Sequence, residues 1–138
     1  MPLTIIRGSN QSLLLYAIRH RPSLIIDCGN CADPHTIYKH ATLEEFENVY
    51  VIEVELLYAF RDVLKALPRF IHELKVSCVV ITAFHYLINY HNEHENKEVA
   101  RHCFEIIESL SKNHNIILGM QDGTHSQEPE NCIGFVIR

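Results

Sequence analysis

The sequence predicts an α/β fold in which a mostly parallel sheet lies between two layers of helices. Short apolar, β-branched runs recur along the 138 residues, and helical patterns separate them. The runs are apolar almost throughout instead of alternating, which is typical of strands covered on both faces. Strands that alternate with helices favour parallel pairing with right-handed crossovers. The runs predicted to be strands are 3–6, 23–27, 49–54, 78–82, 115–120 and 132–137.

The segments between these runs show helical spacing. Residues 12–20 predict a short helix, and residues 34–39 predict a turn or a short helix. Residues 55–74 place apolar side chains three and four positions apart, which predicts an amphipathic helix. Pro68 lies inside that segment, so we expect it to kink the helix or split it in two. Residues 98–113 show a second amphipathic pattern.

Length and composition indicate one cytoplasmic domain that spans residues 1–138. A chain of this length can bury a core, and its 47% apolar and 21% charged residues are ordinary for a globular protein. No apolar run approaches the ~20 residues that span a bilayer. The first residues also lack the apolar stretch of a signal peptide. We therefore expect a cytoplasmic protein that does not contact a membrane.

The charge balance gives no support for binding to nucleic acid. The formal net charge is −5 with ten neutral histidines. Proteins that bind nucleic acid usually carry a basic surface. The candidate for a local basic patch is the run Arg19, His20 and Arg21.

Three segments in the first part of the chain follow the motif order of a nucleotide-binding family. Residues 8–15 (GSNQSLLL) follow the first predicted strand, in the frame of the phosphate-binding loop G-x-x-x-x-G-K-[ST]. Residues 26–37 match the pattern I-D-T-E-G-x-x-x-P-E-R-L in register at Asp27 and Pro34. Residues 43–51 are similar to the segment that precedes the family's third strand.

Two later segments continue the series. Residues 79–83 (VVITA) stand where the family has V-V-I-D-S, and residues 118–121 (LGMQ) stand where it has V-T-N-Q, with Gln121 on the glutamine. In this order the segments resemble the RecA-like recombinases, above all the archaeal RadA and RadB type. The resemblance implies a P-loop topology and a role in DNA repair or recombination. It also implies a protein partner, either a RecA-family homologue or a second copy of this chain.

The positions that handle ATP in that family carry unsuitable side chains here. Leu13, Leu14 and Leu15 stand where the loop has its second glycine, its lysine and its Ser/Thr, and leucine supplies neither charge nor metal ligand. Gly29 stands at the catalytic glutamate, and Thr82 stands at the aspartate that holds Mg²⁺. We therefore expect no ATPase activity, no bound nucleotide and no cofactor. The vestigial loop comprises Gly8, Ser9, Asn10, Gln11 and Ser12.

Polar residues near the ends of predicted strands form the candidate site. In open α/β sheets, ligands bind at the edge where the strands end. The residues expected to meet there are Asp27, Thr82, His85 and Gln121. An enzyme that uses this edge in an unrecognised way is one alternative function.

Cysteines support another alternative. Cys28 and Cys31 form a C-x-x-C pair that could act as redox thiols or begin a zinc site. Zinc needs two further ligands, and the sequence has no second C-x-x-C. The histidines that could supply them are His35, His40, His85, His91 and His94. Because ten histidines in 138 residues produce some clustering by chance, we expect no metal site. The other cysteines, Cys78, Cys103 and Cys132, fall on apolar runs and are predicted to be small core residues.

The function that these observations favour is that of a non-catalytic RecA-like paralogue. Such a protein would serve as an accessory or scaffold subunit, with a link to DNA repair or recombination that comes from the resemblance alone. A metal- or thiol-dependent protein and an enzyme with an unrecognised strand-end site are the two alternatives.

Overall fold

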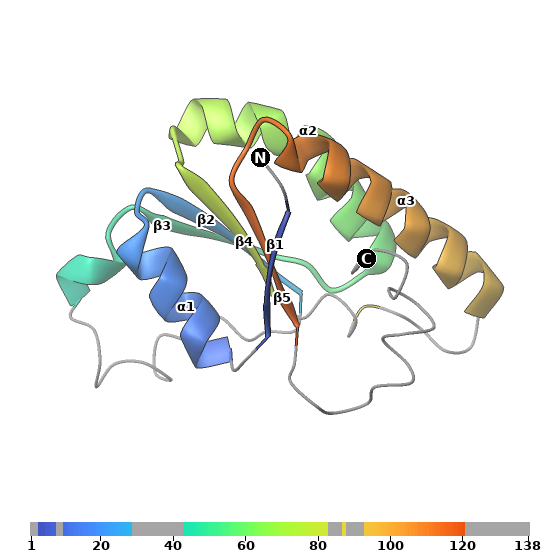
Figure 1. Cartoon of the computed structure of the whole chain (residues 1–138), viewed down its shortest axis with the longest axis horizontal. Coiled ribbons are helices and arrows are strands. Elements are labelled where there is room, and N and C mark those ends of the chain that lie inside the picture. The colour runs from blue at the N-terminus through green and yellow to red at the C-terminus, as the bar shows by residue number, and fades with distance from the viewer. Residues whose placement is uncertain (1–2, 8–9, 29–42, 83–86, 88–92, 121–138) are drawn as a thin grey trace.

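Five parallel strands form one sheet in the computed structural model, which describes residues 3–7, 10–28, 43–82, 87 and 93–120. All four pairings between neighbouring strands are parallel, and the sheet order is β1-β5-β4-β2-β3 (Figure 1). The strands are β1 (Thr4–Arg7), β2 (Ser23–Asp27), β3 (Val49–Glu53), β4 (Cys78–Thr82) and β5 (Ile116–Met120). The predicted α/β class and five of the six predicted strands are confirmed. The sixth predicted strand, 132–137, lies outside the described residues.

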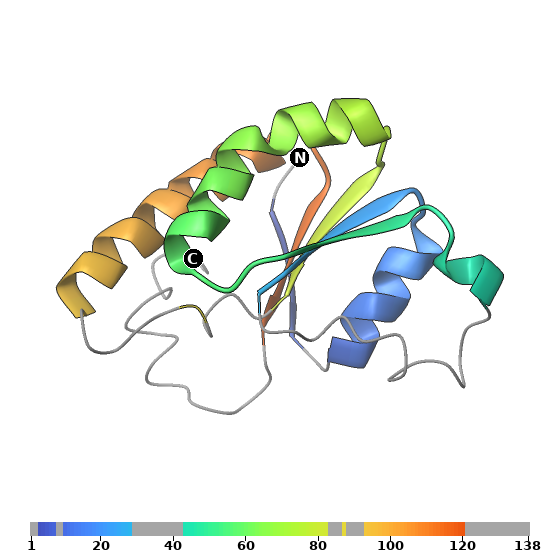
Figure 2. The same ribbon diagram turned by 180° about the vertical axis from the view of Figure 1, so that it is seen from behind.

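Helices cover both faces of this sheet. The elements are α1 (Asn10–Arg19), the 3-10 helix η2 (Leu43–Phe46), α2 (Leu57–Leu74) and α3 (Glu93–Ser111). The chain crosses the sheet in one direction from β1 to β3 and returns from β3 to β5. Because crossovers between parallel strands are right-handed, the first two connections and the last two must lie on opposite faces. Figures 1 and 2 show this arrangement, with α1 and η2 on one face and α2 and α3 on the other.

The larger core lies between the sheet and the pair α2 and α3. Helix α2 buries Phe60, Leu64 and Leu67 at helical spacing, and α3 buries Phe104 and Ile107. The two helices pack on alternate residues of the central strands, because successive side chains of a strand point to opposite faces. The strand residues of this core are Leu24, Ile26, Val79, Ile81, Ile116 and Leu118.

The smaller core lies under α1. Leu13, Leu14, Ala17 and Ile18 form the buried face of this helix. They pack on the strand positions that the larger core leaves, namely Ile25, Cys78, Val80 and Ile117. A single helix of ten residues therefore supplies most of the cover for this face among the described residues.

The structure narrows one sequence expectation and corrects another. Helix α2 continues through Pro68 as one element, so of the two effects expected from this proline the split is excluded. Pro68 lies on the exposed side of α2, and packing of the opposite face stabilises the helix despite the lost hydrogen bond. The strand expected at 49–54 is also not covered on both faces. It is the edge strand β3, where Tyr50 and Val51 are exposed.

No helix in the described ranges combines the length and the hydrophobicity that crossing a bilayer requires.

Candidate functional site

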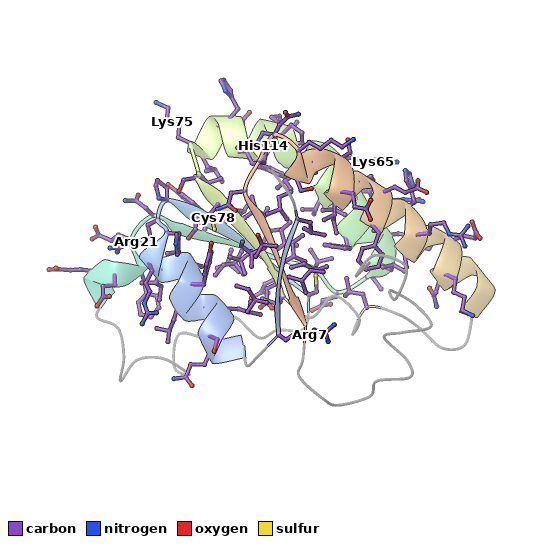
Figure 3. The ribbon with its side chains drawn as sticks, in the orientation of Figure 1. Arg7, Arg21, Lys65, Lys75, Cys78 and His114 are labelled. Atoms are coloured by element: carbon purple, nitrogen blue, oxygen red, sulfur yellow. The ribbon has the colours of Figure 1, made fainter. Side chains whose placement is uncertain are left out.

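The candidate site is the edge of the sheet at which the parallel strands end. Helix α1 begins there directly after β1, with only residues 8 and 9 between Arg7 and Asn10. Figure 3 shows Arg7 at this edge, and Lys75 and His114 at the opposite edge. A strand, a short turn and a helix are the elements between which a phosphate-binding loop lies.

Most of the segment that corresponds to the phosphate-binding loop is helical. Helix α1 begins at Asn10, so Asn10, Gln11 and Ser12 belong to its first turn. A phosphate-binding loop instead wraps the anion with backbone N–H groups of non-helical residues before the helix begins. Gly8 and Ser9, the first two residues of the predicted vestigial loop, lie outside the described residues.

The leucines of this segment enter the smaller core. Leu13 and Leu14 are only 2% and 4% exposed, and Leu15 packs half-buried against the same cluster. The resemblance implies a lysine at the position of Leu14, but the Leu14 side chain is buried in an apolar core. This stretch of the chain therefore serves to pack α1 on the sheet.

A missing side chain on β5 makes room for Leu13. A Cβ atom added at Gly119 would lie 2.9 Å from Cδ2 of Leu13 and still closer to its Cδ1. Cβ atoms in proteins do not approach other heavy atoms so closely. The large residue on α1 and the glycine on β5 are therefore complementary in shape. Sequence reasoning missed this pair, because the two residues are far apart in the chain.

A buried hydrogen-bonded cluster joins the ends of β2 and β4. Asp27 and Thr82 are paired in register on neighbouring strands, and both are buried. The Thr82 hydroxyl donates to Oδ1 of Asp27 at 3.0 Å, and the backbone N–H of Cys28 donates to Oγ1 of Thr82 at 3.1 Å. The backbone N–H of Val54 donates to the carbonyl oxygen of Asp27 at 2.9 Å.

The chemistry of this cluster follows from the hydroxyl of Thr82. The resemblance places an aspartate at position 82. Two buried carboxylates side by side repel each other unless a proton or a cation lies between them. A threonine can instead donate a proton to Asp27 and accept one from the backbone of Cys28. The arrangement satisfies buried polar groups internally.

The structure brings together two of the four predicted strand-end residues. Asp27 and Thr82 are in contact, whereas His85 and Gln121 lie outside the described residues. Cys28 is buried, and its Sγ donates to the carbonyl oxygen of Ile26 at 3.9 Å. Its predicted companion Cys31, and also Gly29, lie outside the described residues. Among the residues that are described, no three metal-ligating side chains gather.

The other described cysteines lie in the core, as predicted for Cys78 and Cys103. Burial raises the pKa of Cys78 to about 11 and that of Cys103 to about 12, although Arg61 and Lys65 lower the latter. Both thiols are therefore protonated at neutral pH, and the reactive thiolate form is scarce. Cys132 lies outside the described residues.

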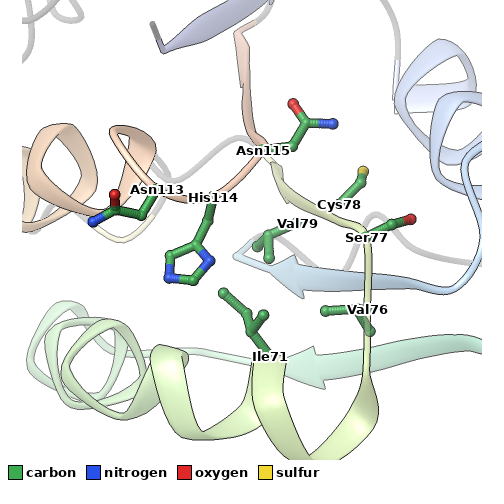
Figure 4. Close-up of a pocket in the computed structure, with 8 residues that line it drawn as sticks. All are labelled: Ile71, Val76, Ser77, Cys78, Val79, Asn113, His114 and Asn115. Atoms are coloured by element: carbon green, nitrogen blue, oxygen red, sulfur yellow. The ribbon is translucent and has the colours of Figure 1, made fainter. Parts of the chain in front are cut away.

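A small pocket lies at the opposite edge, where β4 and β5 begin. Its volume is about 180 Å³. Figure 4 shows the imidazole of His114 pointing toward Ile71 across this pocket. Ligand sites usually enclose about 300–1,000 Å³, so the pocket is small for a substrate. The lining residues are Ile71, Val76, Ser77, Cys78, Val79, Asn113, His114 and Asn115.

Comparison with known proteins assigns no family to this arrangement. No protein-family model matches the chain, and no curated protein matches it.

Proposed function

We propose that this chain is a non-catalytic RecA-like accessory or scaffold protein that acts through contacts with another protein, in DNA repair or recombination. One observation carries the proposal: α1 begins at Asn10 and buries Leu13 and Leu14 where a nucleotide-binding protein has the glycine and lysine of its phosphate loop. The link to repair and recombination rests on the resemblance of the sequence motifs.

The strand order supports a RecA-like P-loop topology. The start of α1, the end of β4 at Thr82 and the end of β5 at Met120 all lie at one edge of the sheet, because all five strands are parallel. Strand β5 lies between β1 and β4. The segments that the resemblance identifies as loop, metal-binding strand end and V-T-N-Q strand are thus neighbours, as a shared nucleotide site would require.

The residues that differ from the resembled motifs belong to two pairs whose members contact each other closely. Such contacts favour selection for a stable fold over the random accumulation of substitutions. Leu13 fills the space above Gly119, and Thr82 bonds to Asp27. In the first pair both residues differ from the resembled motifs, because Leu13 stands at a glycine and Gly119 at a threonine; in the second, Thr82 stands at an aspartate beside Asp27, which matches the motif. We infer that the fold has been kept while nucleotide chemistry has been lost.

Calorimetry with MgATP tests this proposal. We expect no saturable heat up to about 1 mM ATP, a limit that corresponds to a binding free energy weaker than about −4 kcal/mol. The Leu14→Lys variant tests whether the lysine alone is missing, and we expect it not to bind ATP either, because residues 10–12 are helical. Saturable binding of MgATP to the wild-type protein at micromolar concentration would refute the non-catalytic proposal.

A further inference from the structure

The exposed large apolar side chains of the described residues are concentrated in one short stretch, 50–58. They are Tyr50 at 36%, Val51 at 46%, Leu56 at 67% and Tyr58 at 44% exposure. Scattered exposed apolar residues are common on proteins, but a concentration of them marks an interaction site. This stretch comprises most of β3 and the beginning of α2.

Strand β3 is the last strand of the described sheet, and the described part of the chain gives it none of the usual protection of an edge. Among the described residues it pairs only with β2. Natural edge strands usually avoid pairing with other chains by means of lysine, proline or a bulge. The sequence of β3, VYVIE, has neither lysine nor proline, and its single charge is Glu53 at the end. Its outer edge is therefore suited to hydrogen bonding with another extended segment.

The sequence from residue 43 to residue 60 carries charge of one sign, although Arg61 lies over the ring of Tyr58 and Arg21 lines the hollow beside β3. Between residues 43 and 60 the sequence contains five glutamates and no lysine, arginine or histidine. Two of them, Glu53 and Glu55, are exposed at the end of β3 and just after it. Clusters of one charge at an interface select partners of the opposite charge.

A hollow beside the start of β3 extends the acidic surface. It has a volume of about 450 Å³, and its lining includes Glu44, Glu45, Glu47 and Asn48, the residue that precedes β3. Arg21, the one basic residue among the described residues of the lining, donates to the carbonyl oxygen of Glu44 at 3.1 Å. The hollow can receive a lysine or arginine side chain from a segment that runs along β3.

We propose that the outer edge of β3 binds an extended segment of a partner protein in which apolar residues alternate with lysine or arginine. The segment would add as a strand beside β3, with apolar side chains near Val51 on one face and Tyr50 on the other. A basic side chain would enter the hollow at Glu44 and Glu47. This inference rests on the proposed function, because it specifies the partner of a protein that acts by contact.

Charge favours a basic protein segment over the two other possible occupants of this edge, which are a second copy of the chain and nucleic acid. A second copy would bring its own five glutamates against the first set, and like charges across an interface are unfavourable. Nucleic acid would be repelled by the same carboxylates. A basic, apolar protein segment is the occupant that the surface favours.

Fluorescence anisotropy with a labelled peptide that alternates lysine and valine tests the proposal. We expect saturable binding that weakens with added salt, because the attraction is screened. A version with glutamate in place of lysine should not bind. A version with proline at alternate positions should also fail, because proline cannot donate hydrogen bonds to the edge.

Matched variants locate the site. We expect Val51→Lys to weaken binding at least about tenfold, and Glu47→Lys combined with Glu53→Lys to do the same. The control combines Glu105→Lys with Glu108→Lys, which makes the same change in net charge on exposed positions of α3 and should leave binding unchanged. Unfolding in urea establishes that each variant is folded. Equal binding by wild type and the β3 variants, or no binding by wild type, would overturn the proposal.

Sedimentation tests the second copy as occupant. We expect a monomer; a wild-type dimer that Val51→Lys dissociates would instead identify self-pairing and overturn the proposed partner. The outcome is distinct from that of the ATP experiment. Saturable MgATP binding refutes the non-catalytic function and leaves the peptide result standing, whereas failure of the peptide alone refutes only the partner.

Discussion

Apolar side chains are buried at one border of the sheet and exposed at another. The first border is the start of α1, and the second is the outer edge of β3. At the start of α1, leucines stand where a nucleotide-binding protein needs glycine and lysine, and they are buried. At β3, tyrosine and valine stand on an edge strand and are exposed. The start of α1 buries its apolar side chains in the core, and the edge of β3 exposes the side chains to which we propose that a partner protein binds. The difference indicates where binding is to be sought on this molecule.

The largest difference in the free energy of unfolding is expected when leucine is replaced by lysine once at each border. Leu14→Lys would bury an unpaired ammonium group in the core under α1, and it should lower the free energy of unfolding by more than about 3 kcal/mol. Leu56→Lys makes the same exchange at a residue that is 67% exposed, and it should change the free energy by less than about 0.5 kcal/mol. Urea unfolding measures both. Similar losses of stability at the two positions would contradict the conclusion that leucine is buried at the first border and exposed at the second.

A smaller effect is expected where α1 meets β5. Gly119→Ala should destabilise the protein by about 1–3 kcal/mol, because the new methyl group collides with Leu13. Leu13→Ala should be destabilising alone, but combined with Gly119→Ala it should remove the collision. The double variant should therefore be more stable than the two single effects predict when added. Additive effects in urea unfolding would show that the two side chains do not share one space.

The smallest of the three effects is expected at the end of β4. Thr82→Val removes the hydroxyl that donates to Asp27 and accepts from Cys28, and it should lower the free energy of unfolding by about 1–2 kcal/mol. Thr82→Ser retains the hydroxyl and should recover part of this loss. Equal stability of the valine variant and the wild type would show that the hydrogen bonds of this hydroxyl do not stabilise the fold.

Sequence patterns predicted the sheet well because they reflect burial. Apolar runs located all five described strands, and the alternation with helices predicted their parallel pairing. The same rule failed for β3. Its run VYVIE is as apolar as that of a central strand, but Tyr50 and Val51 are exposed because β3 is at the edge. Edge position depends on strand order, which a local pattern does not contain.

The candidate site was harder to predict because its contacts join distant residues. The three leucines at 13 to 15 were visible in the sequence, but the start of α1 at Asn10 was not. Gly119 gave no sign of its role beneath Leu13, and the bond between Thr82 and Asp27 required the knowledge that β2 and β4 are neighbours. The sequence alone therefore shows which side chains stand at these positions, and the structure shows that Leu13 and Leu14 are buried and that Thr82 bonds to Asp27.

The space that Gly119 leaves for Leu13 also limits which substitutions can be accepted during the evolution of this protein. A mutation to glycine at position 13 would leave a void above β5, and a larger residue at position 119 would collide with Leu13. A single substitution at either position is therefore expected to give a less stable protein. Lineages that carry this pair are therefore expected to retain the packed start of α1.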